Sequence, residues 1–210
     1  GRGPGACYQG SVSRVSARPR AILALAGSLW SLITFPLVGP GWSWPWVDAI
    51  AAAEPYRSIA QSVEDPYVLF GALGALSFVA IGLALLPTAR TGRWGAIALA
   101  GLIILGGPAS ALSYLGTPED SPLHFMWGAE GYVLLLIGIA GLAAAITART
   151  RWPAWAVALV GCTVLVLIAG GLALAYYPHG CLVLLGVEVA ILVLGVPAPV
   201  AEDQEGAAAG

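Results

Sequence analysis

Six apolar runs, separated by short segments that hold most of the charged residues, restrict this chain to one class of fold. The runs cover residues 21–38, 68–86, 95–115, 131–147, 154–176 and 181–196. At a rise of about 1.5 Å per residue, each helix would be about 24 to 35 Å long, and the hydrocarbon core of a bilayer is about 30 Å thick. The sequence therefore predicts an all-α, polytopic membrane protein with six transmembrane helices over residues 21–197.

The composition agrees with a membrane protein. Hydrophobic residues make up 59% of the chain and charged residues only 10%, with a mean hydropathy of +0.85, whereas about a quarter of the residues in a soluble domain are charged. Lys and Asn are absent, and Arg, Ala, Gly and Pro are plentiful, as in genomes that avoid A-rich codons. In this overall texture the chain resembles multi-pass integral membrane proteins of high-GC actinobacteria. The resemblance includes no diagnostic motif. It implies location in a bacterial plasma membrane, but it does not indicate any particular activity.

The arginines predict the orientation of the chain. All basic residues are Arg, and most precede the first apolar run or lie between runs two and three and between runs four and five: Arg2, Arg14, Arg18, Arg20, Arg90, Arg93, Arg149 and Arg151. Only Arg57 lies on the opposite side. Because basic residues stay in the cytoplasm, both termini are predicted to be cytoplasmic.

The first run and the two tails allow further predictions. Arginines before an apolar run also occur in signal peptides, but no small-x-small cleavage site is near Pro36 and Pro40, so we interpret the run as an uncleaved span after a cytoplasmic tail, residues 1–20. The acidic tail, residues 198–210, is expected to be disordered in the cytoplasm.

The segment between the first two runs, residues 39–66, is predicted to be an extracytoplasmic loop. It opens with Trp42, Trp44 and Trp46, and tryptophan favours the headgroup layer of a bilayer. Apolar residues at Trp46, Ile50, Ile59 and Val63 would give short helices one apolar side. We therefore expect an interfacial helix in this loop, lying on the membrane surface.

An internal similarity joins the two cytoplasmic turns. Residues 82–98 read GLALLPTARTGRWGAIA and residues 141–156 read GLAAAITARTRWPAWA. The shared TART run and the same orientation favour a parallel duplication of a two-helix hairpin. The alternative is that Ala-rich spans joined by an Arg turn are alike in composition alone.

Polar residues at membrane depth form the candidate site. Glu188 is the one acid in the run CLVLLGVEVAILVLGV, and a carboxyl group in hydrocarbon is costly unless it has a partner. Other polar residues are expected in the same outward half of the protein: Ser110, Ser113, Tyr114, His124, Glu130 and His179. We expect a water-accessible vestibule that leads to Glu188. The alternative is that Glu188 fixes helix packing through a hydrogen bond to a hydroxyl group, while the other residues lie in wet loops and an aromatic belt.

Several classes of site are disfavoured. Cys7, Cys162 and Cys181 form no CxxC pair, so neither a redox motif nor a cysteine zinc site is indicated. Two histidines with a carboxylate can bind a transition metal or a haem, but the loops show no recognised ligand spacing. We expect no metal and no cofactor. No basic patch indicates nucleic acid.

Two functions of different classes remain. The first is a non-enzymatic accessory or scaffold membrane protein in which the polar cluster holds the helices together. The second is a small proton-coupled transporter or carrier with Glu188 as the titrating group. A membrane enzyme ranks third, because no nucleophile with a base and no HExxH-type motif is found. The expected partners are lipid and either another membrane protein or a second copy of the chain.

Overall fold

The computed structural model describes residues 9–196, and within this range the chain is helical with no strands. The predicted all-α class is thus confirmed. Most of the chain lies in long rods, which are α1 (Gln9–Val38), α4 (Pro66–Leu73) with α5 (Ala75–Ala89), α6 (Arg93–Leu115), α7 (Ala129–Ala148), α8 (Ala154–Gly161) with α9 (Thr163–Leu174), and α10 (His179–Gly195). The expected disordered tail 198–210 and the start of the N-terminal tail, residues 1–8, lie outside the described residues.

Within residues 9–196, three helical segments are long and apolar enough to cross a membrane. They are Ala17–Val38, Pro66–Leu115 and His124–Ala148. α8 and α9 together form a fourth if the pair, which is bent by 51°, is one span, and α10 is a shorter apolar helix. The lengths and apolar character of these helices are therefore compatible with a membrane protein.

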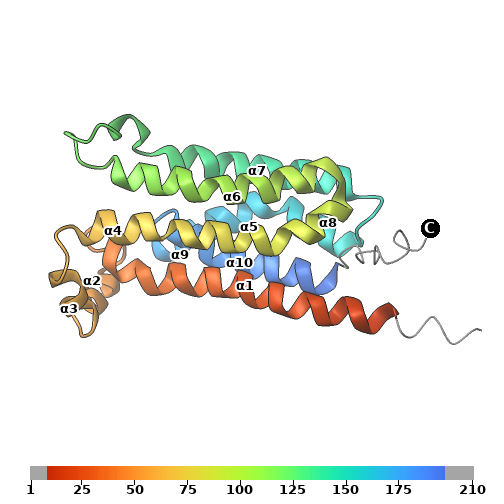
Figure 1. Ribbon diagram of the computed structural model, residues 1–210, viewed down its shortest axis with the longest axis horizontal. Helices are drawn as coiled ribbons and strands as arrows, with labels where there is room; N and C mark the ends of the chain where they lie inside the picture. The colour runs from red at the N-terminus through yellow and green to blue at the C-terminus, as the bar shows by residue number, and fades with distance from the viewer. Residues whose placement is uncertain (1–8, 197–210) are drawn as a thin grey trace, which may run out of the picture.

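The segment Pro66–Leu115 is a hairpin rather than one straight rod. A short 3-10 helix, η1 (Arg90–Gly92), ends α5, and Arg93 has a φ of +66° that reverses the chain into α6. α5 and α6 then pack closely and antiparallel, because a Cβ at Gly106 would overlap the ring of Phe78 and one at Gly82 would overlap Ile104. The chain thus runs along the bundle and returns beside itself (Figure 1).

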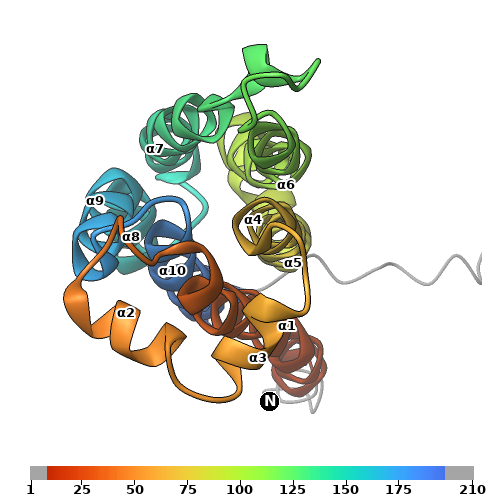
Figure 2. The same cartoon turned by 90° about the vertical axis from the view of Figure 1, so that its left-hand side faces the viewer.

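The last long helix is largely buried in the bundle. α10 packs against α1, α5, α8 and α9, and Figure 2 shows it between α9 and α1 in the bundle. Consistent with that position, most of its side chains are buried, among them Leu182, Leu185, Val189 and Leu192. The apolar run that contains Glu188 is therefore a helix with one exposed face, at Val187, Ile191 and Leu194, and is otherwise largely buried.

Large apolar side chains also cover the outside of the rods. Ile22, Leu105, Leu135, Ile146 and Leu172 are each at least 59% exposed. An exposed aliphatic surface of this kind is unfavourable in water and favourable in lipid. Inside, polar groups join the helices: Ser28 donates to the Val183 carbonyl at 2.9 Å, and the Trp30 indole donates to the Leu73 carbonyl at 2.9 Å.

The two ends of the bundle differ (Figure 1). One end, here called the arginine end, carries the turns with Arg90, Arg93, Arg149 and Arg151. The other, here called the loop end, carries residues 39–65 and 116–128. Two short helices, α2 (Pro45–Ala51) and α3 (Tyr56–Gln61), occupy the first of these loops. Their position on a membrane surface stays a prediction.

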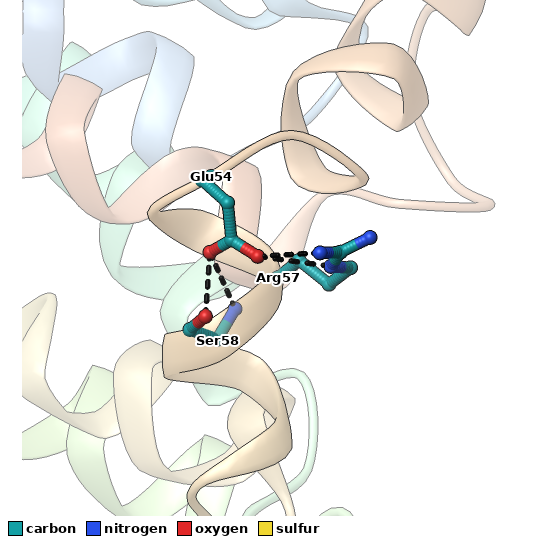
Figure 3. A network of polar contacts seen from close by, with 3 residues as sticks. All are labelled: Glu54, Arg57 and Ser58. Carbon is teal, nitrogen blue, oxygen red and sulfur yellow. Dashed lines mark hydrogen bonds and ion pairs between the residues drawn. The ribbon is translucent and has the colours of Figure 1, made fainter.

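A small surface network organises the start of α3 (Figure 3). The Arg57 guanidinium contacts the Glu54 carboxylate at 2.7 Å, and the hydroxyl group of Ser58 donates to the same carboxylate. Hydrogen bonding by Ser58 and then by Arg57 lowers the pKa of Glu54. Because the side chains of Glu54 and Arg57 are more than half exposed, the network fixes local geometry and contributes little to global stability.

The two similar turns pack against each other at the arginine end. The indole of Trp152 donates to the Thr91 hydroxyl at 2.8 Å, and a Cβ at Gly92 would lie 2.7 Å from its ring. Trp152 is 4% exposed, whereas Trp94, its counterpart in the first turn, is 67% exposed. The matching residues thus have different surroundings, and the duplication stays a prediction.

Candidate functional site

The structure separates the predicted polar residues into two places. Glu188 lies in the middle of α10, nine positions after His179, which is about 13 Å along the helix axis. The other predicted residues lie toward the loop end, on α6, on α7, on the first turn of α10 and in the segment before α7. Each group has its own partners.

Glu188 faces a neighbouring helix. Its side chain is 3% exposed, and its Oε1 accepts a hydrogen bond of 2.7 Å from the hydroxyl of Thr163 on α9. Thr163 also donates to the Val160 carbonyl at 2.7 Å, so its hydroxyl is shared between the end of α8 and the acid. The second oxygen, Oε2, is buried without a hydrogen-bond partner among the described residues.

The predicted serines of α6 have different surroundings. Ser113 is 1% exposed, and its hydroxyl accepts from the backbone N–H of Gly128 at 2.9 Å, just before α7 begins. Ser110 is equally buried, but its hydroxyl has no partner within the described part of the chain. Only Ser113 therefore helps to place the first turn of α7.

Three tyrosines join distant segments at the loop end. The hydroxyls of Tyr114 and Tyr176 lie 2.9 Å apart, and Tyr176 donates onward to Tyr67 at 3.3 Å. Tyr114 lies against α4, because a Cβ at Gly71 would overlap its ring. α4, α6 and the segment before α10 are thereby connected by one chain of hydroxyl groups.

His179 lies beneath these tyrosines and is completely buried. Its ring neighbours are Phe35, Tyr114 and Tyr176, at centroid distances of 6.3, 6.2 and 5.7 Å. Neither ring nitrogen has a hydrogen-bond partner among the described residues. A Cβ at Gly74 would lie 3.1 Å from Nε2, so the glycine between α4 and α5 leaves room for the imidazole.

A pocket of about 950 Å³ opens above this aromatic group. Its lining comes from both loops, from the start of α4, from α7, and from Ala175–Tyr177 between α9 and α10. Two carboxyl groups are the charged side chains of the lining within the described residues, on Asp65 and Glu130. Six of its residues are aromatic, namely Trp42, Tyr67, Trp127, Tyr132, Tyr176 and Tyr177. Neither His179 nor Glu188 is part of the described lining.

The two acids of the pocket are held differently. Asp65 is the N-cap of α4, where its carboxylate accepts from the Val68 N–H at 3.0 Å. Glu130 lies in the first turn of α7 and is only 9% exposed, and its Oε2 has no hydrogen-bond partner in the described part of the chain. Asp65 thus has a structural role, while Glu130 presents a buried acceptor that no donor of the described residues reaches.

The second histidine contributes to the loop and not to the pocket. The Nδ1 of His124 lies 2.9 Å from the Gly116 carbonyl, and its ring stacks on Trp127 at 6.1 Å. Within residues 9–196, no group of three or more His, Cys, Asp or Glu side chains could hold a metal ion. His124 and His179 therefore share no site in this structure.

Sequence reasoning found Glu130 but missed most of the pocket around it. Asp65, Tyr67, Trp127 and Tyr132 were not singled out, although each lies at the end of an apolar run. The available signal was the concentration of aromatic residues at one end of the molecule, which equally fits an aromatic belt in the headgroup layer. Only folding shows that these rings surround one space.

No protein-family model, curated protein or solved structure matches this chain.

Proposed function

We propose that the chain crosses the plasma membrane of a bacterium six times, with both termini in the cytoplasm. The rods of apolar helix, the aliphatic outer surface and the hairpin fold of Pro66–Leu115 support this topology. The clustering of arginines at one end of the bundle supports the orientation. In this orientation the loop end and its pocket face the outside.

Within that membrane, the chain is a non-enzymatic accessory or scaffold protein. The observation that supports this function best is the hydrogen bond of 2.7 Å between Thr163 and Glu188, because through it the acid of α10 contacts a neighbouring helix and not the pocket. Hydrogen bonds between membrane helices typically contribute about 0.6 kcal/mol and at most about 2 kcal/mol. Glu188 in this role orients α10 relative to α9.

A proton-coupled carrier is the second candidate, and one observation favours it. The bend of 51° between α8 and α9 lies at Cys162, directly before the threonine that contacts Glu188. Broken helices in carriers commonly form the binding site near the middle of the bilayer. Oε2 of Glu188, which has no hydrogen-bond partner among the described residues, would be the proton-accepting atom.

Titration of Glu188 distinguishes these two functions. We expect that Glu188→Gln, which keeps the acceptor for Thr163, changes the free energy of unfolding in detergent by under about 1 kcal/mol. Infrared difference spectroscopy in lipid, between about pH 5 and 9, compares the carboxyl bands of the native protein and the variant.

The scaffold function predicts that no titrating band is lost in Glu188→Gln over this range. A band that titrates in the native protein and is missing from the variant would replace the scaffold function by the carrier. Thr163→Val is the matched control, because it removes the hydroxyl donor and leaves the carboxyl group in place. Its carboxyl band should shift in frequency without disappearing.

A further inference from the structure

The charges of the loop-end pocket all have one sign. Asp65 and Glu130 line it, and none of the lining residues in the described part of the chain is Arg, Lys or His. Glu130 is the more informative acid, because it is nine-tenths buried and its Oε2 has no donor among the described residues. A buried carboxylate without a partner is costly. A cation in the pocket would supply that partner.

The rings of the pocket suit the same ligand. The face of a Trp or Tyr ring attracts a cation that lies within about 6 Å of its centre, and the attraction is strongest for Trp. Trp127 is held in place by stacking on His124, although it is 62% exposed. A ring that is oriented by stacking and remains exposed is a suitable wall for a ligand.

Glu130 and the rings lie together at one place in the pocket. A Cβ at Gly131, the residue after Glu130, would lie 3.6 Å from the ring of Tyr177. Burial and then the nearby Glu130 carboxylate raise the pKa of Tyr177. Carboxylate and ring therefore face the same space between α7 and the segment before α10.

We propose that this pocket binds a small organic cation with an alkylammonium group, which lies between the aromatic rings and contacts the carboxylate of Glu130. The volume of about 950 Å³ is at the upper end of the range for ligand pockets and admits a molecule much larger than a metal ion. The proposal does not depend on the role of Glu188.

The ammonium group can belong to a free molecule or to the headgroup of a zwitterionic lipid. A lipid brings a phosphate next to its ammonium group, and a phosphate is bound through basic side chains or backbone N–H groups. Because no basic side chain lines the described pocket, the free cation fits better. Both sources present an ammonium group to the pocket. Choline binding in lipid discs with and without phosphatidylethanolamine distinguishes them.

Choline is a suitable probe, and 3,3-dimethylbutan-1-ol is its uncharged counterpart of the same shape. Binding of each is measured by calorimetry with the full chain in nanodiscs of phosphatidylglycerol, which has no ammonium group. We expect choline to bind at least about tenfold more tightly than the alcohol, because only the cation is attracted by the Glu130 carboxylate and by the faces of the aromatic rings. This comparison uses the native protein and does not depend on the folding of a variant.

Variants assign the binding to the pocket. Glu130→Gln keeps the size of the side chain and should weaken choline binding at least about tenfold. Trp127→Leu should weaken it about two- to fivefold, the value of one exposed cation–ring contact. Glu64→Gln removes the same charge from an exposed residue that does not line the pocket, and should leave the affinity unchanged.

Nanodiscs that contain phosphatidylethanolamine identify the source of the ammonium group. Unchanged choline binding in these discs supports a free cation, and loss of choline binding there supports the lipid headgroup as the occupant of the same site. The proposal is overturned if choline fails to bind in phosphatidylglycerol discs, if the neutral alcohol binds equally well, or if Glu64→Gln and Glu130→Gln have the same effect.

Discussion

At the scale of single residues, the partners of the polar side chains separate structural from functional roles. Glu188 and Ser113 each accept a hydrogen bond from another segment, although the second carboxylate oxygen of Glu188 has no partner among the described residues. Oε2 of Glu130 and both ring nitrogens of His179 are also buried without a partner in that part of the chain. The rings of Phe35 and Tyr176 pack against the imidazole of His179 and partly stabilise it in this buried position. Glu130 differs from His179 because its side chain lines the pocket.

Glu54 provides a test of the surface geometry at this scale. Its pKa is lowered chiefly by the Ser58 hydroxyl and then by Arg57. We therefore expect Ser58→Ala to raise the pKa of Glu54 toward its ordinary value of 4.5, as measured by NMR titration of the labelled carboxyl group. Because the folded pKa is the lower one, the network stabilises the start of α3 above the ordinary pKa and is lost as the pH falls through the folded pKa.

Arg57→Gln is the matched comparison for that titration. It removes the second cause of the shift and should raise the pKa of Glu54 by less than Ser58→Ala does. A titration curve of Glu54 that is the same in the native protein and in Ser58→Ala would contradict the geometry of Figure 3.

At the scale of elements, close approach of backbones decides how the helices cross. α9 and α10 meet at Gly170 and Gly180, where a Cβ on either glycine would overlap the carbonyl oxygen of the other. Glycine-mediated contacts of this kind are common between membrane helices, because dispersion and packing replace the hydrophobic effect there. The contact lies close to His179 and the tyrosines, and so it also positions the wall of the pocket.

Gly170→Ala tests this crossing. The added methyl group meets backbone atoms, which cannot rotate away, so we expect the free energy of unfolding to fall by about 1 to 3 kcal/mol, as in overpacked cores. Unfolding of the purified protein in mixed micelles with increasing SDS measures the change.

Gly101→Ala is the control for that substitution, since a Cβ at Gly101 meets nothing within 4 Å. Its stability should stay the same or rise by up to about 1 kcal/mol, because Ala favours a helix over Gly. Equal effects of the two substitutions would mean that α9 and α10 do not approach as closely as the structure indicates.

At the scale of the whole molecule, the bundle is a set of antiparallel rods with a basic end and an aromatic, acidic end. The helix α10 contacts both the early rods α1 and α5 and the late rods α8 and α9. The similar sequence runs at residues 82–98 and 141–156 meet at the arginine end through Trp152 and Thr91. The pocket draws on both loops at the other end.

Labelling of single cysteines tests the proposed topology. With the native cysteines replaced, Ile50→Cys and Asp120→Cys should react with an impermeant reagent added to intact cells, because both lie in loops at the end proposed to be outside. Thr150→Cys, on the exposed turn at the arginine end, should react only after the cells are opened. Reaction of Thr150→Cys from outside would overturn the orientation.

The sequence by itself determined the class of the protein. The apolar runs predicted helices whose ends lie close to those observed, for example 95–115 for α6 (Arg93–Leu115) and 181–196 for α10 (His179–Gly195). This succeeds because the cost of placing a residue in hydrocarbon depends on that residue and its near neighbours, and adds up along the chain. The breaks at Gly74 and Cys162 were not predicted, since each run reads as continuous.

Only the tertiary structure decided what the polar side chains meet. Ser110, Ser113 and Glu188 look alike as polar residues in apolar runs, but one has no partner in the described chain, one contacts the loop before α7, and one contacts α9. Which groups meet depends on the rotation of each helix about its axis and on the crossing angles. Those are set by packing between residues far apart in the chain, such as Gly170 against Gly180, and local sequence carries no record of them.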